Sequence, residues 1–73
     1  MSTTSQDRWI EMQPIGTDTL RIELTRVGHL WHGRAAKLTN RMIDRNALAT
    51  VVGADFENVR FQVLQTAQQA LKH

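Results

Sequence analysis

Two histidines, His29 and His32, stand three residues apart in the stretch GHLWHGR at residues 28–34. Histidines at this spacing can share a metal ion on a helix, where residues three apart are neighbours on one face. The flanking Gly28 and Gly33 disfavour a helix, and on a strand residues three apart point to opposite faces. The chain has no cysteine and only one further histidine, so we predict solvent-facing histidines and no metal site.

Residues that commonly carry out covalent chemistry are scarce. The chain has no cysteine, and its two serines, Ser2 and Ser5, both stand in a polar N-terminal stretch. It contains no Gly-x-Ser-x-Gly, no glycine-rich phosphate loop and no His-Glu-x-x-His motif. A chain of 73 residues also has little room for a concave pocket. We therefore predict a protein that is not an enzyme and uses no cofactor.

The length of 73 residues allows one domain with a thin core. Without cysteine, neither disulfides nor thiolate-bound zinc can reinforce it, so stability must come from packing or self-association. The N-terminus lacks a signal-peptide pattern, and no apolar run reaches the roughly 18 residues that span a bilayer. We expect a soluble, cytoplasmic protein without a membrane partner.

Alternating hydrophobicity predicts the strands. Residues 1–7 are small and polar and are expected to form a disordered tail before a single domain at residues 8–73. Residues 8–15 have the mixed pattern of an edge strand, with Pro14 near its end. In residues 19–27, Leu20, Ile22 and Leu24 alternate with Arg21, Glu23 and Thr25, which predicts a half-buried strand.

A hairpin is expected at Gly28, with a loop of either Val27–Gly28 or Gly28–His29, because glycine permits positive φ. Both loops give the same two faces. The inward face should carry Leu20, Ile22, Leu24, Trp31, Gly33 and Ala35, and the outward face Arg21, Glu23, His32 and Arg34.

The C-terminal part combines one unclear segment with one clear helix. Residues 39–54 show no single apolar stripe, so we predict a short helix or structured loop there, although ATVV within it also fits a short strand. Asp55 should cap a helix at residues 56–71, whose apolar residues recur at helical spacing. The predicted fold is α+β, a three-stranded antiparallel meander packed against one C-terminal helix.

Two kinds of macromolecular partner fit this fold. Nine basic and seven acidic residues leave a net charge of +2, which permits a nucleic acid without requiring one. Arg21, His32 and Arg34 should lie on the uncovered face of the sheet, with Arg26 near the hairpin tip. Arginines on a β-ribbon can enter a DNA groove, so DNA or RNA binding is one hypothesis.

Protein–protein interaction is the hypothesis that we favour, as a small regulatory module of the inhibitor or accessory-subunit type. Phe61 falls off the apolar stripe of the helix whereas Arg60 falls on it, and Trp9 is difficult to bury. Aromatic residues and arginine dominate interface hot spots. An explanation within one chain is also open: segment 39–54 covers Phe61, and the aliphatic part of the Arg60 side chain packs along the edge of the sheet. The edge strand could also pair with a second copy in a homodimer.

Overall fold

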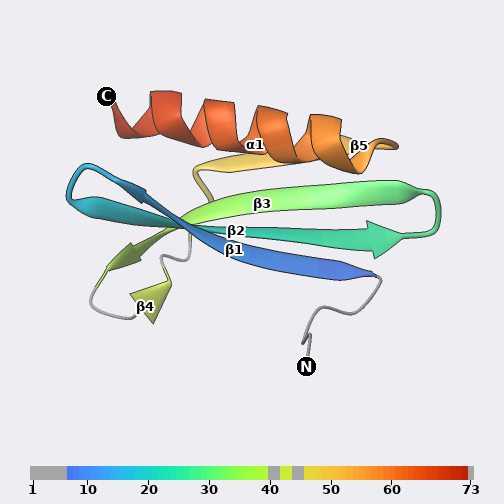
Figure 1. Cartoon of the computed structure of the whole chain (residues 1–73), viewed down its shortest axis with the longest axis horizontal. Coiled ribbons are helices and arrows are strands. Elements are labelled where there is room, and N and C mark those ends of the chain that lie inside the picture. The colour runs from blue at the N-terminus through green and yellow to red at the C-terminus, as the bar shows by residue number, and fades with distance from the viewer. Residues whose placement is uncertain (1–6, 40–41, 44–45, 73) are drawn as a thin grey trace.

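The computed structural model describes residues 7–39, 42–43 and 46–72 of the chain and has an α+β architecture (Figure 1). The elements are β1 (Arg8–Ile15), β2 (Asp18–Val27), β3 (Leu30–Thr39), β4 (Met42–Ile43), β5 (Ala49–Gly53) and α1 (Phe56–Leu71). The predicted fold class, an antiparallel sheet covered by one C-terminal helix, is confirmed. No helix among the described residues has the length and hydropathy needed to cross a membrane.

The sheet is antiparallel, with β1, β2 and β3 side by side and both β4 and β5 paired with the far edge of β3. Val27 pairs with Leu30, so the hairpin loop is Gly28–His29, one of the two predicted loops. Gly28 has a φ of 64°, a left-handed conformation that glycine adopts without steric cost. The resulting register places Leu24 opposite Gly33, as the sequence predicted.

Segment 39–54 extends the sheet where it is described, which corrects the prediction of a short helix or loop and confirms the alternative of a short strand at ATVV, residues 49–52. Thr39 ends β3, and Met42–Ile43 and Ala49–Gly53 are strands paired with it. β-branched residues fill the centre of β5 and favour the pleated conformation. Without this pairing, the edge of β3 would leave its backbone groups unsatisfied beneath the helix. Residues 40–41 and 44–45 lie outside the described residues.

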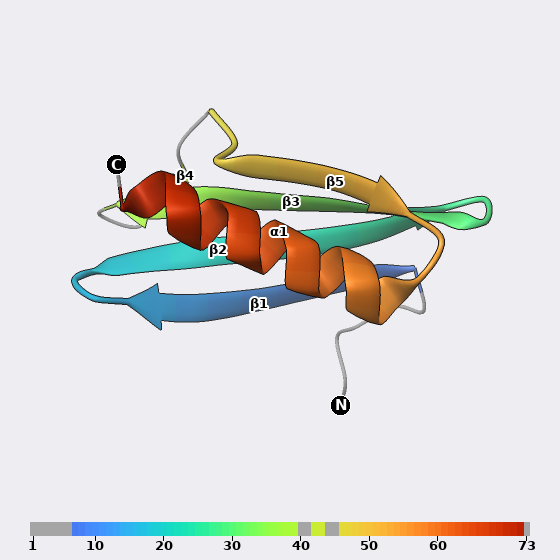
Figure 2. The ribbon, with the colours of Figure 1, turned by 90° about the horizontal axis from the view of Figure 1, so that it is seen from above.

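The core lies between the sheet and α1. Its fully buried large side chains are Leu20, Ile22, Leu24, Val59 and Val63. In Figure 2 the helix crosses the sheet diagonally, beginning over the start of β1 and ending over β3 and β4. Small residues permit the close approach, since a Cβ atom on Gly33 would lie 2.8 Å from Val59 Cγ1 and one on Gly53 2.9 Å from Val59 Cγ2.

The ends of the helix and of the domain are fixed by specific contacts. Asp55 is the N-cap, as predicted, and its Oδ2 accepts a hydrogen bond from the backbone N–H of Asn58 at 2.9 Å. Asp7 belongs to the predicted tail, yet its carbonyl accepts a hydrogen bond from the backbone N–H of Arg26 at 2.8 Å. The β1–β2 pairing thus continues one residue before β1. The rest of the predicted tail, residues 1–6, lies outside the described residues.

Candidate protein-interaction surface

The face of the sheet opposite α1, called the outer face below, is covered by no described helix (Figure 1). Side chains of a strand point alternately to the two faces, so the register assigns each residue to one of them. From the five strands the outer face receives Arg8, Ile10, Met12, Pro14, Thr19, Arg21, Glu23, Thr25, Val27, Leu30, His32, Arg34, Ala36, Leu38, Ile43, Thr50 and Val52.

Large hydrophobic side chains are exposed mainly on this face. Of the nine found exposed in the described part of the chain, six belong to it: Ile10, Met12, Val27, Leu30, Ile43 and Val52. The solvated face of an antiparallel sheet normally alternates to polar residues. The outer face departs from that pattern on all five strands, so it combines exposed apolar groups with charge.

Glu23 organises the charges of the outer face. Arg8 Nε donates a hydrogen bond to Glu23 Oε2 at 2.7 Å, and Arg21 Nη1 donates one to Oε1 at 3.4 Å. Burial raises the pKa of Glu23, but the hydrogen bonds from Arg8 and Arg21 outweigh it and leave the pKa below its usual value. The Arg21 side chain is only 17% exposed, whereas that of Arg8 is 55% exposed. Arg8 is therefore much more accessible to a partner than Arg21.

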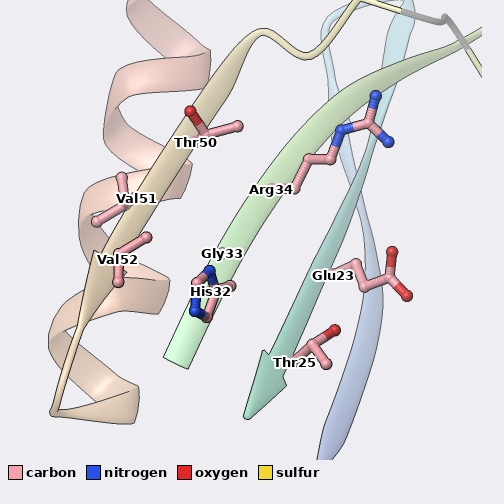
Figure 3. Close-up of a pocket in the computed structure, with 8 residues that line it drawn as sticks. All are labelled: Glu23, Thr25, His32, Gly33, Arg34, Thr50, Val51 and Val52. Atoms are coloured by element: carbon pink, nitrogen blue, oxygen red, sulfur yellow. The ribbon is translucent and has the colours of Figure 1, made fainter. Parts of the chain in front are cut away.

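A shallow hollow of about 260 Å³ lies on the outer face, where β2, β3 and β5 run side by side (Figure 3). Its lining includes Glu23 and Thr25 from β2, His32 and Arg34 from β3, and Val52 from β5. The volume falls below the roughly 300–1,000 Å³ of small-molecule pockets. The hollow therefore has the size to accept one protruding side chain of a partner.

The four residues predicted for nucleic-acid binding do not share one surface. Arg21, His32 and Arg34 lie on the outer face, as predicted. Arg26 lies at the hairpin end of β2 on the opposite side, and its Nη2 is 2.7 Å from Asp7 Oδ1. His29 lies in the loop beyond it. Nowhere in the described ranges do three or more potential ligands come together to hold a metal ion.

The three residues predicted for a protein interface lie on the helix side of the molecule. The Trp9 ring is perpendicular to that of Phe56, with centroids 5.9 Å apart, and Trp9 remains 37% exposed. Arg60 points to the sheet and forms an ion pair with Glu11 of β1. Phe61 is 61% exposed, so the described part of segment 39–54 does not cover it. Of the three, Phe61 is the most accessible.

Glu11 did not stand out in the sequence, although its carboxylate accepts four hydrogen bonds from described side chains. Arg60 Nε donates to its Oε1 at 2.5 Å and Arg60 Nη2 to its Oε2 at 2.9 Å, while Trp9 and Gln13 donate one bond each. The hydrogen bonds from Arg60, together with those from Trp9 and Gln13, outweigh the effect of burial and lower the pKa of Glu11 from 4.5 to about 2. The sequence contained one indication of this ion pair. Arg60 falls on the apolar stripe of the helix, and a cation that faces the sheet is stabilised by an anion on the strand below it.

Comparison with known proteins adds no further evidence on function. No protein-family model matches the chain, and no curated protein or solved structure is significantly similar to it.

Proposed function

We propose that this protein is a non-enzymatic, cytoplasmic binding module, a small inhibitor or accessory subunit that docks a partner protein on its outer face. The observation that carries the proposal is the concentration of exposed large hydrophobic side chains on the outer face, which holds six of the nine found among the described residues. Exposed apolar surface that recurs over neighbouring strands is typical of protein interfaces. The helix exposes mainly amides and one aromatic residue, Phe61, to solvent.

The charges of the outer face suit a protein partner with carboxylates. Arg8, Arg21 and Arg34 lie among the apolar residues, and Glu23 is the single acidic residue that the register assigns there. Arginine next to apolar groups is a common composition of interface hot spots. The hollow between Val52 and Thr25 would receive one apolar side chain of the partner.

Affinity purification with matched variants tests the proposal. The variant Leu30→Thr/Val52→Thr removes apolar surface from the outer face and keeps residues that favour strands. The control Phe61→Gln removes a comparably exposed side chain from the helix, where glutamine is well tolerated. Wild-type and variant proteins would be used to isolate partners from cells of the source organism, with bound proteins quantified by mass spectrometry.

A specific partner should be retained by wild type and by Phe61→Gln, and reduced about tenfold or more by the outer-face variant. Loss of the partner only in Phe61→Gln would instead locate the interface on the helix side, with Trp9 and Arg60 nearby. Failure of the wild-type protein to enrich any partner would contradict the proposal.

Nucleic-acid binding is the second candidate, because Arg21, His32 and Arg34 share the outer face. Binding to random-sequence DNA or RNA would weaken steeply between low and moderate salt, since bound counterions are released. Arg34→Ala should then lower the salt slope by about one. Absence of binding at low salt would remove this candidate. The exposed apolar groups on the same face favour a protein partner over a nucleic acid.

A further inference from the structure

We propose that two copies of the chain pair in antiparallel fashion through the free edge of β1, which makes the sheet continuous across a homodimer. Within the described residues β1 pairs with β2 alone, over eight residues and without a bulge. The opposite edge of the sheet is divided between β4, of two residues, and β5, of five. A long and regular edge strand is a template for pairing with another chain, whereas short and interrupted edges resist it.

The β1–β2 register shows which backbone groups remain free. In an antiparallel pair, residues that exchange hydrogen bonds alternate with residues whose amide and carbonyl point away from the partner strand. Asp7 belongs to a hydrogen-bonded pair, because its carbonyl accepts from the N–H of Arg26. The amides and carbonyls of Arg8, Ile10 and Met12 therefore point away from β2. Pro14 has the same orientation but carries no N–H to donate.

Charge and proline disfavour the two registers next to one that is centred on Ile10, in the direction of Pro14. With Ile10 opposite Ile10 of the other copy, Arg8 lies opposite Met12, and all three free amides find a carbonyl. If the two-fold axis of the pair passed through Glu11 instead, the two Glu11 carboxylates would lie opposite each other. If it passed through Met12, Ile10 would lie opposite Pro14, which has no N–H to donate. Like charges directly opposite one another are destabilising. The register centred on Ile10 avoids both conflicts.

Exposure along β1 supports the same interface. Ile10 is 41% exposed and Met12 51% exposed on the outer face, and Trp9 is 37% exposed on the helix face. An edge strand that faces only water is usually protected by charged residues on its surface. In the proposed register Ile10 packs on Ile10 of the other copy, and Trp9 lies opposite the other copy's Glu11. The outer faces of the two copies then adjoin and remain open to a partner.

Sedimentation equilibrium over a range of protein concentrations tests the dimer, since one chain has a mass of 8.3 kDa. We expect the wild-type protein to reach twice that mass. Ile10→Pro removes an amide that β2 does not use, so the variant should remain folded by circular dichroism and stay monomeric. Ile10→Lys keeps the amide but places two ammonium groups across the two-fold axis, and should raise the dimer dissociation constant about tenfold or more.

The control Val52→Thr changes a residue of the outer face that is somewhat more exposed than Ile10 and lies far from β1, and it should leave the dimer intact. Hydrogen exchange measured by NMR gives a second readout, because dimerisation should protect the amides of Arg8, Ile10 and Met12. A wild-type protein that is monomeric at all concentrations would overturn the proposal. So would a dimer that persists in both Ile10 variants, or one in which the Ile10 amide exchanges as fast as a free amide.

Discussion

The ion pair between Glu11 and Arg60 should make the stability of the fold depend on pH. The folded pKa of Glu11, about 2, lies below its ordinary value of 4.5. A carboxyl whose pKa is depressed by folding stabilises the protein above its unfolded pKa and loses this contribution as pH falls. The contribution should be complete above about pH 5 and should disappear between pH 4.5 and pH 2.

The size of the effect follows from the shift. A fall in pKa from 4.5 to about 2 corresponds to about 3 kcal/mol at neutral pH. The Glu11 side chain is 14% exposed but that of Arg60 is 32% exposed, so solvent screens the pair in part. We expect Glu11→Gln to lower the free energy of unfolding by about 2 kcal/mol at pH 7. That loss is a large fraction of the roughly 5 kcal/mol typical of a small domain.

Urea unfolding of wild type and Glu11→Gln at several pH values, at one fixed protein concentration, measures this difference. Other titrating groups are common to both proteins, so their contributions cancel in the comparison. The difference should shrink from about 2 kcal/mol at pH 7 towards zero near pH 2. Arg60→Met should have a similar cost at pH 7, and the double variant should cost less than the sum of the two. A difference that does not change with pH, or a pair of additive variants, would refute the reasoning.

Two further predictions concern the position of the helix. Gly33→Ala should lower the free energy of unfolding by about 1–3 kcal/mol, because the new Cβ atom would meet Val59 Cγ1 at 2.8 Å. In urea titrations, the double variant Gly33→Ala/Val59→Ala should lose less stability than the sum of the two single variants. Additive losses would contradict the contact. Asp55→Ala should cost about 1 kcal/mol by removing the acceptor of the Asn58 amide, which lowers the melting temperature by about 4–8 °C. Asp55→Ser should retain most of that stability, and an equal loss in both variants would show that the cap is not the cause.

Elements with a long, uninterrupted pattern were predictable from the sequence. Leu20, Ile22 and Leu24 alternate without a break, and all three are fully buried. Apart from the inversion at Arg60 and Phe61, the helix repeats its apolar residues at one period from Phe56 to Leu71, and it has a capping residue before it. In both cases the local preference and the tertiary environment agree, so a single pattern was sufficient.

Within segment 39–54 only the short strand at ATVV was indicated by the sequence, because the pattern of the segment as a whole is interrupted. Leu38 pairs with Ile43 and Ala35 pairs with Ala49, so three steps along β3 correspond to six along the facing segment. The excess residues shift the alternation between β4 and β5, and no single period fits the whole segment. Its conformation is determined by the open edge of β3, which is a tertiary requirement.

The difficulty of predicting β4 and β5 also explains which part of the candidate surface was predicted. The outward direction of Arg21, His32 and Arg34 followed from alternation in β2 and β3 alone. Ile43 and Val52 join them only because β4 and β5 pair with β3, so this part of the apolar character of the outer face was not visible in the sequence. Glu11 required knowledge of which strand lies beneath Arg60.

The two faces of the sheet differ in what they would gain from a partner. On the helix side, Val59 and Val63 already close over Gly33 and the inward side chains of β2, and of the nine exposed large hydrophobic residues in the described ranges only Trp9, Met42 and Phe61 lie there. On the outer side, apolar side chains stay in water at a cost of about 25 cal/mol for each Å² that could be buried. A 73-residue chain with a thin core has little stability to spare for such exposure. Threonine would suit a solvated strand equally well. The presence of Ile, Leu, Met and Val on the outer face therefore favours a docked protein over an unoccupied surface.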